Sequence, residues 1–218
     1  MEFTYKYDRP ALTVDIVVFG IANNAPSVLV VKRGIAPYRN RWALPGGFVR
    51  NNETLEEAAE RELFEETSLR TSHLTQLKAF SAIDRDPRER VITVAFFAMV
   101  KSTDFKLSAG TDAKEAKWIS LHQKKLDLAF DHVDIVEFSR KWLIENLYKN
   151  NIALKVLPEN FTLTQVQQLY EGILNTSIDK RNFRKYIISS GLIKKTKIKL
   201  TDVAYRSPYM YALTERGI

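Results

Sequence analysis

Three glutamates and an arginine crowd a short stretch of the chain, where their carboxylates could do metal chemistry. Glu62, Glu65 and Glu66 follow Arg61 within two helical turns. On a helix, side chains at i, i+3 and i+4 share one face, where like charges repel. A hard divalent cation such as Mg²⁺ or Mn²⁺ prefers carboxylate oxygen and would remove this conflict. The pattern therefore predicts a metal site made by Glu62, Glu65 and Glu66.

The element that must carry these side chains is a helix over residues 54–67. Thr54 and Glu57 have the spacing of a capping box, which marks the start of a helix. The apolar residues Leu55, Ala58 and Leu69 fall in line with the glutamates, so the carboxylates interrupt the core-facing stripe. An ordinary charged surface helix with accidental alignment is the alternative reading.

The wider spacing resembles a known family. A glycine, a glutamate and the run Arg-Glu-Leu-x-Glu-Glu resemble the Nudix box, G-x5-E-x7-R-E-U-x-E-E-x-G-U, where U is aliphatic. The matching positions are Gly47, Glu53, Arg61, Glu62, Leu63, Glu65, Glu66 and Leu69. Ser68 departs from the pattern, because it stands where the family has its second glycine. A left-handed backbone there costs serine about 1 kcal/mol more than glycine.

The resemblance implies a Nudix-fold α/β/α sandwich over residues 1–150 and a metal-dependent hydrolase site. Glu65, Glu66 and Arg61 would be catalytic, with Arg61 orienting the glutamates, and Glu53 would support the site. Gly46 and Gly47 let the backbone approach the same place, because they lack a Cβ. Mg²⁺ or Mn²⁺ would be the cofactor if the metal site is used.

Arg85 and Arg88 are further candidates for ligand binding, since guanidinium groups suit diphosphates. A turn held by local ion pairs with Asp86 explains the same residues equally well. His122 and His132 are each expected to be a capping or core group. For the aromatic residues Tyr38, Trp42 and Phe48, a place in the core is the safer expectation than stacking on a base.

Strands and helices alternate through the first 150 residues. The segments 13–20 and 27–33 predict a hairpin, 91–100 a buried strand, and residues 116–121 another strand. Residues 131–150 have the period of an amphipathic helix. Mixed in this order, the elements predict an α/β sandwich.

The composition and residue pattern of the chain change after residue 150. Pro158 and the irregular segment before it suggest a domain boundary, with a second domain over residues 155–218. Thr162 and Gln165 form a second capping box, and Asp179 can cap another helix that Gly191 closes. The segments 192–200 and 208–217 then predict two short strands. Helix, turn, basic helix and hairpin together predict a winged helix-turn-helix.

The second domain is strongly basic, which predicts binding to double-stranded DNA. Of the chain's net charge of +7, residues 151–218 contribute +6, from 11 basic and 5 acidic side chains. Phe183, Ile187 and Ile188 would face the core of this domain. The predicted DNA-binding residues are Lys180, Arg181, Arg184 and Lys185 on the helix, and Lys194, Lys195 and Lys197 on the wing. A lysine-rich docking surface is the alternative.

The segments 81–100 and 128–132 resemble ADP-ribose pyrophosphatase-type Nudix proteins, and residues 157–193 resemble the winged helix of Nudix-related transcriptional regulators. That resemblance implies a homodimeric, DNA-binding regulator whose Nudix domain senses an ADP-ribose-type nucleotide or a pentose sugar. The alternative is an active Mg²⁺-dependent hydrolase. A bifunctional protein that both regulates transcription and hydrolyses a nucleotide is also possible. A sugar-responsive regulator that binds no metal is a third, weaker reading, because the glutamates are intact.

Composition agrees with a cytoplasmic protein. A hydrophobic content of 45% with 27% charged residues is typical of a globular chain, not a disordered one. The chain has no cysteine, which excludes disulfides and thiolate metal sites. The N-terminal residues lack the apolar segment of a signal peptide, and no apolar run is long enough to span a bilayer, so we expect no membrane partner.

Overall fold

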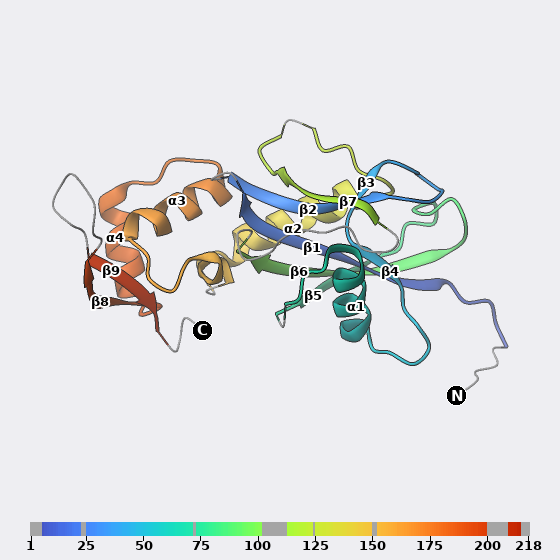
Figure 1. Cartoon of the computed structure of the whole chain (residues 1–218), viewed down its shortest axis with the longest axis horizontal. Helices are drawn as coiled ribbons and strands as arrows, with labels where there is room; N and C mark the ends of the chain where they lie inside the picture. Colours follow the sequence, from blue (N-terminus) through green and yellow to red (C-terminus); the bar gives the residue numbers. More distant parts are fainter. Residues whose placement is uncertain are drawn as a thin grey trace. The chain divides into compact units, whose positions relative to one another are not determined.

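The computed structural model describes residues 6–22, 25–71, 73–101, 113–123, 125–149, 152–199 and 209–214. The chain divides into two compact units, and the division falls between Lys141 and Trp142. Figure 1 shows the course of the chain, coloured along the sequence. Among the described residues, no helix has both the length and the apolar character needed to cross a membrane.

The first unit is built on a seven-stranded sheet. Its main path runs in the order β3-β2-β1-β6-β5, with β4 paired to β1 and β7 paired to β2. The strands are β1 (Ala11–Ala22), β2 (Ala25–Arg33), β3 (Trp42–Ala43), β4 (Gly46–Phe48), β5 (Thr75–Phe80), β6 (Val91–Val100) and β7 (Ala113–Ser120). The hairpin, the buried strand and the strand near residue 116 are therefore confirmed. Strands β3, β4 and β5 were not predicted from the sequence.

Strand β1 is the centre of this sheet. It runs parallel to β6, with Ala11 opposite Val91 and Gly20 opposite Val100, and antiparallel to β2 and β4. Because β1 has neighbours on both edges and helices on both faces, its sequence is almost continuously apolar. Asp15 is the one charged residue within Thr13–Gly20 of this strand.

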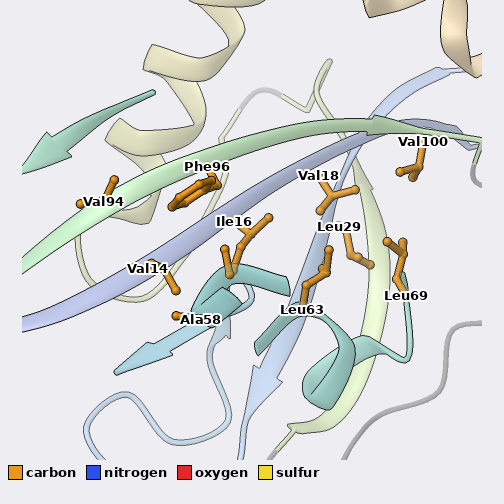
Figure 2. Packing of buried hydrophobic residues seen from close by; sticks show 11 residues of the cluster. Val14, Ile16, Val18, Leu29, Ala58, Leu63, Leu69, Val94, Phe96 and Val100 are labelled. Atoms are coloured by element: carbon orange, nitrogen blue, oxygen red, sulfur yellow. The ribbon is translucent and has the colours of Figure 1, made fainter. Parts of the chain in front are cut away.

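Helix α1 and the first part of α2 lie on opposite faces of the sheet. Helix α1 (Leu55–Thr67) packs against Val14, Ile16 and Val18 of β1, and Figure 2 shows Ala58 and Leu63 in this cluster. Successive strand residues point to opposite faces, so Asp15 faces the other side, where helix α2 (His132–Asn146) begins. Figure 1 shows α1 in front of the sheet and α2 behind it. The predicted α/β/α sandwich is confirmed.

Both ends of α1 follow from local sequence. Thr54 accepts a hydrogen bond from the Glu57 backbone N–H, and the Glu57 side chain accepts one from the Thr54 backbone N–H, as the capping box predicts. Ser68 ends the helix in the left-handed region, at φ 59° and ψ 13°, and its N–H donates to the Phe64 carbonyl. The position therefore has the backbone that favours glycine.

The second unit is a small helical domain with a hairpin. After the 3-10 segment Ile152–Val156, helices α3 (Leu163–Leu174) and α4 (Lys180–Ser189) are followed by strands β8 (Ile193–Lys199) and β9 (Tyr209–Leu213). The second capping box is present, Asp179 caps α4, and Gly191 follows that helix with φ 72°. The predicted winged helix-turn-helix is confirmed.

An aromatic cluster forms the core of the second unit. Tyr170 of α3 is fully buried and contacts Phe183 of α4 and Tyr148, which precedes the domain in sequence. The Tyr170 hydroxyl donates to the Leu147 carbonyl, and the Tyr186 hydroxyl donates to the Tyr148 carbonyl. These bonds attach both helices to the residues that directly follow α2.

Candidate ligand pocket and nucleic-acid interface

A pocket of about 340 Å³ opens in the first unit beside the glutamate-bearing helix. It is lined from β1, β2, β4, α1, the segment between β5 and β6, and the start of α2. Glu62 and Glu66 enter from α1, and Gly46 and Gly47 supply backbone on the same side. The structure thus brings predicted glycines and predicted glutamates together at one place.

Arg61 holds the acidic residues of α1 in position. Its Nε and Nη2 donate to the two carboxylate oxygens of Glu53 at 2.9 and 2.6 Å. Its Nη1 donates to Glu62 at 2.6 Å and to Glu65 at 3.2 Å, and Nη2 also reaches the Phe48 carbonyl at 3.1 Å. Hydrogen bonds from Arg61 lower the pKa of Glu53 to about 2. Glu53 lies outside the pocket lining. It is connected to the lining through Arg61, which donates to Glu62, and through the backbone N–H of Arg50, which donates to Glu53 at 2.8 Å.

Glu66 is the most deeply placed of the glutamates. Burial raises its pKa to about 8, although the Gly46 N–H donates to its Oε2 at 3.0 Å. Burial also raises the pKa of Glu62, and the charge of Glu62 contributes to the raised pKa of Glu66. Gly47 makes this close packing possible, because a Cβ there would lie 2.3 Å from Glu62 Oε1.

The acidic side chains suit a divalent cation by their chemistry, since Glu62 and Glu66 bring two carboxylates together in the pocket. Glu62 pairs with Arg61, whereas Glu66 accepts a hydrogen bond from the uncharged Gly46 N–H. Glu65 is placed differently: it does not line the pocket, its side chain is 43% exposed, and it also pairs with Arg50. Within the described ranges, no three carboxylate or imidazole side chains are grouped tightly enough to hold a metal. A site made by Glu62, Glu65 and Glu66 therefore stays a prediction.

A second ionic network lies on the α2 side of the sheet. Arg85 donates twice to Asp131, at 2.9 and 2.7 Å, and once to Asp15 at 3.1 Å. Nε2 of His132 lies 3.4 Å from Asp15, and its Nδ1 accepts the Leu44 N–H at 2.8 Å. Burial lowers the pKa of His132, so the imidazole is neutral. His132 is a core group, as the sequence indicated.

Arg88 is the more accessible of the two candidate arginines. It pairs with Asp86 at 2.7 Å, and its guanidinium lies 5.4 Å from the Phe48 ring centre and 5.9 Å from that of Phe130. The local ion pair and a pocket position are both present, since Arg85, Asp86 and Arg88 all line the pocket. That these arginines bind a diphosphate group stays a prediction.

The aromatic residues near the pocket correct one expectation. Phe48 is 41% exposed and Tyr38 is 36% exposed, so neither fills the core. Phe48 lines the pocket, and Tyr38 packs edge-on against Phe130. Trp42 is partly buried, with Lys117 3.9 Å from its ring centre. The physical reason is that a pocket mouth leaves ring faces open, which sequence hydrophobicity cannot distinguish from a core position.

In the second unit, the predicted DNA-binding residues lie on one exposed side of α4 and on β8. Lys180, Arg181 and Lys185 are exposed, and Arg184 is partly buried. On the wing, Lys194, Lys195 and Lys197 are exposed, and Lys195 lies 3.3 Å from the Tyr209 ring centre. Phe183 and Ile187 are buried as expected. Ile188 is 51% exposed, so its expected core position is wrong: it follows the exposed side of α4.

Sequence reasoning missed Asp15, Asp131, Arg33 and Phe130. Asp15 carried the clearest signal, because a lone acid in an apolar strand needs a partner, which is Arg85 here. Arg33 ends β2, lines the pocket and lies 4.8 Å from the Phe130 ring centre. Burial, followed by the charge of Arg88, lowers the pKa of Arg33. No sequence spacing pointed to it.

Two family models match the chain, one for each unit. The NUDIX domain model matches residues 10–138, and the model of the NrtR DNA-binding winged helix domain matches residues 153–213. The chain is similar to the ADPR responsive transcriptional repressor NtrR of Acinetobacter baylyi, with 32% identity over 213 residues, 96% of this chain and 85% of that protein. It is 41% identical to the ADP-ribose pyrophosphatase of Methanocaldococcus jannaschii over 136 residues, 62% of this chain and 76% of that one.

Solved structures of one regulator resemble both units. The structure of Shewanella oneidensis NrtR with a 27mer DNA is similar with a TM-score of 0.78 and 29% identity, covering 93% of each chain. The NUDIX domain of that protein, solved with ADP ribose, matches with a TM-score of 0.59 and 30% identity, over 63% of this chain and 90% of that one.

Proposed function

Because this chain belongs to the Nudix family, in the branch whose Nudix domain precedes an NrtR winged helix, we propose that it is a DNA-binding transcriptional repressor that responds to ADP-ribose. The observation that carries the proposal is the similarity to an ADPR responsive repressor over 96% of the chain, which includes both the pocket and the basic helix. We assign residues 1–150 to the sensor and residues 155–218 to DNA binding.

In this proposal, α4 enters the major groove and the wing lies on the flanking backbone. Arg181, Arg184 and Lys185 would meet base edges or phosphates from α4, while Lys180, Lys194, Lys195 and Lys197 would neutralise phosphates. The exposed positions of the lysines support this role. We also propose that the protein binds as a homodimer, because two winged helices match two half-sites of an operator. Light scattering of the full chain, which gives its mass in solution, tests that point.

ADP-ribose would bind in the pocket of the first unit. Arg85 and Arg88 line it and suit the diphosphate, and Gly46 and Gly47 give a backbone surface that a ligand can approach. The residues that would hold Mg²⁺ or Mn²⁺ are Glu62, Glu65 and Glu66. When bound, the cation would neutralise phosphate charge. The hydrogen bonds from Arg61 to Glu62 and Glu65 support this assignment, because they hold the two carboxylates in place.

The proposal is tested by gel shift of the full chain on a duplex from the region upstream of its own gene. We expect a shift that a scrambled duplex does not give and that ADP-ribose changes. Arg181→Ala should weaken binding by about 5- to 150-fold, since a base contact contributes about 1–3 kcal/mol. Lys141→Ala, which removes an exposed charge on α2, is the matched control. Equal binding to the scrambled duplex would reject the regulator.

Hydrolysis of ADP-ribose is the second candidate function. It is favoured by the 41% identity to an ADP-ribose pyrophosphatase and by the intact Arg61 network with Glu53 and Glu62. Water would attack one phosphorus and the products would be AMP and ribose 5-phosphate. Incubation with ADP-ribose and Mg²⁺ should yield AMP, and Glu66→Gln should abolish the reaction. If AMP does not form with the parent protein, the sensor role alone is retained.

A further inference from the structure

Of the lysine and arginine side chains that line the pocket, one has no carboxylate partner among the residues that the structure describes. The set is Lys32, Arg33, Arg50, Arg85 and Arg88. Four are paired: Lys32 with Glu115, Arg50 with Glu65, Arg85 with Asp15 and Asp131, and Arg88 with Asp86. Arg33 is the exception, although its residue is only partly exposed. An unpaired charge in such a place is costly, so it indicates a ligand of opposite charge.

The chain holds Arg33 in a fixed direction. It is the last residue of β2, where its N–H donates to the Arg41 carbonyl and its carbonyl accepts the Asn40 N–H, both at 2.9 Å. Its side-chain Nε donates to the Pro37 carbonyl at 2.8 Å. In the described ranges, Nη1 and Nη2 have no hydrogen-bond partner, and neither is among the fully buried polar atoms that lack one. Both therefore keep accessible surface, and their direction is set before a ligand arrives.

A second guanidinium lies near that of Arg33. The guanidinium carbons of Arg33 and Arg88 lie 4.8 and 5.9 Å from the ring centre of Phe130. Burial and the charge of Arg88 lower the pKa of Arg33, and the acidic groups nearby do not reverse the effect. Two like charges beside one ring oppose each other, and an anion bound between them would offset that repulsion.

The free donors of the two arginines suit a diphosphate. Guanidinium groups bind phosphate oxygens through parallel N–H donors. Arg33 offers Nη1 and Nη2, whereas Arg88 uses Nε and Nη2 for Asp86 and has Nη1 left. A diphosphate carries its negative charge on two adjacent groups, so it can accept from both arginines at once. An uncharged sugar would leave the charge of Arg33 unbalanced.

We propose that Arg33 binds the diphosphate of the effector through Nη1 and Nη2, with Arg88 beside it. The inference rests on the proposed response to ADP-ribose and adds a residue that recognises the charged part of that ligand. Arg33 thereby favours a nucleoside diphosphate sugar over a free pentose, which has no group to accept its two donors.

The test compares Arg33→Gln with the parent as full chains. Glutamine has an amide nitrogen where arginine has Nε, so the hydrogen bond to the Pro37 carbonyl can persist while Nη1 and Nη2 are lost. Calorimetry with ADP-ribose should show about 10- to 150-fold weaker binding, because hydrogen bonds to a charged group are lost. Arg70→Gln is the matched control: it removes the same charge from a guanidinium that lies 3.7 Å from the Phe64 ring centre, outside the pocket. It should bind as the parent does.

Arg33→Lys separates charge from geometry and remains a test if Arg33→Gln does not fold. Lysine keeps the charge but has no pair of parallel donors, so ADP-ribose should bind more weakly than to the parent and more tightly than to Arg33→Gln.

Inorganic pyrophosphate identifies the group that Arg33 binds. It should raise the unfolding temperature of the parent more than that of Arg33→Gln. Equal shifts in the two proteins would overturn the inference.

The outcomes for ADP-ribose distinguish the inference from the proposed function. If Arg33→Gln binds ADP-ribose as tightly as the parent, or loses no more affinity than Arg70→Gln, the inference is wrong while the proposed function stands. If the parent itself does not bind ADP-ribose, the proposed effector is wrong and the inference is rejected with it.

Discussion

At the scale of single residues, Glu66 tests the predicted metal site. Its carboxylate is buried beside Glu62, so its replacement by a neutral amide should remove a charged ligand from any cation. We expect calorimetry with Mg²⁺ or Mn²⁺ to show binding that Glu66→Gln weakens by about tenfold or more. Glu60→Gln, an exposed glutamate on the same helix, is the matched control. Equal cation binding by Glu66→Gln and the parent would disprove the metal site.

Ser68 gives a prediction about backbone strain. It ends α1 in the left-handed region, which disfavours residues with a Cβ. Ser68→Gly should therefore raise the free energy of unfolding by up to about 1 kcal/mol, less what glycine gains in the unfolded state. Ser68→Ala keeps the Cβ and should bring no such gain. Urea denaturation of the three proteins decides, and equal effects of glycine and alanine would show that the backbone at Ser68 is not strained.

His132 should make the protein sensitive to mild acid. Burial holds its pKa below the ordinary 6.5 despite Asp15 and Asp131, with Arg85 and Arg33 lowering it further. The unfolded chain therefore takes up a proton that the folded one refuses. The contribution of neutral His132 to the free energy of unfolding is therefore complete above about pH 6.5 and is lost as the pH falls below that value. The raised pKa values of Glu62 and Glu66 act in the opposite direction, so the comparison must be made between variants.

The measurement for His132 is urea denaturation at about pH 7.5 and about pH 5.5. The parent should lose more stability on acidification than His132→Asn, whose amide oxygen takes the place of Nδ1 and can still accept the Leu44 N–H. An equal loss in both proteins would show that His132 does not cause the acid sensitivity.

At the scale of elements, the two adjacent isoleucines of α4 separate folding from function. Ile187 is fully buried, and Ile188 is 51% exposed. Ile187→Ala should lower the free energy of unfolding of the second unit by about 2–5 kcal/mol. Ile188→Ala should change it by no more than about 0.5 kcal/mol. Amide hydrogen exchange in α3 and α4 reports on this unit. A large loss with Ile188→Ala would show that Ile188 is packed in solution.

The sequence predicted elements well where local chemistry sets them. The capping boxes at Thr54 and Thr162 gave the helix starts, and the left-handed position at Ser68 followed from the box pattern. Strands β3 and β4 have only two and three residues, and they exist because β2 and β1 pair with them. Such strands have no periodicity of their own to detect.

The pocket was predicted only in part for a related reason. The glutamates of α1 lie close together in sequence, so helical spacing revealed them. Arg85 meets Asp15 and Asp131 across 70 and 46 residues, and no local pattern joins the three. The open rings of Tyr38 and Phe48 were misplaced, because apolar residues at a pocket mouth have the composition of a core.

At the scale of the whole molecule, the proposed function requires reciprocal coupling between two ligands. If ADP-ribose changes the affinity for DNA by some factor, DNA must change the affinity for ADP-ribose by the same factor. Titrating ADP-ribose into the free protein and into the protein–DNA complex gives the affinity for ADP-ribose in each state. An ADP-ribose affinity that is identical in the two titrations would show that the pocket does not control DNA binding.

The parallel pairing of β1 with β6 also has a consequence for how the chain is made. During translation β1 is synthesised early, but its edge stays unpaired until β6 is synthesised, because Ala11 pairs with Val91. The pocket waits longer still, because Asp131 and His132 come later than β6. Nascent chains that end before β6 therefore leave one edge of an apolar strand unpaired, and those that end before α2 lack part of the pocket lining.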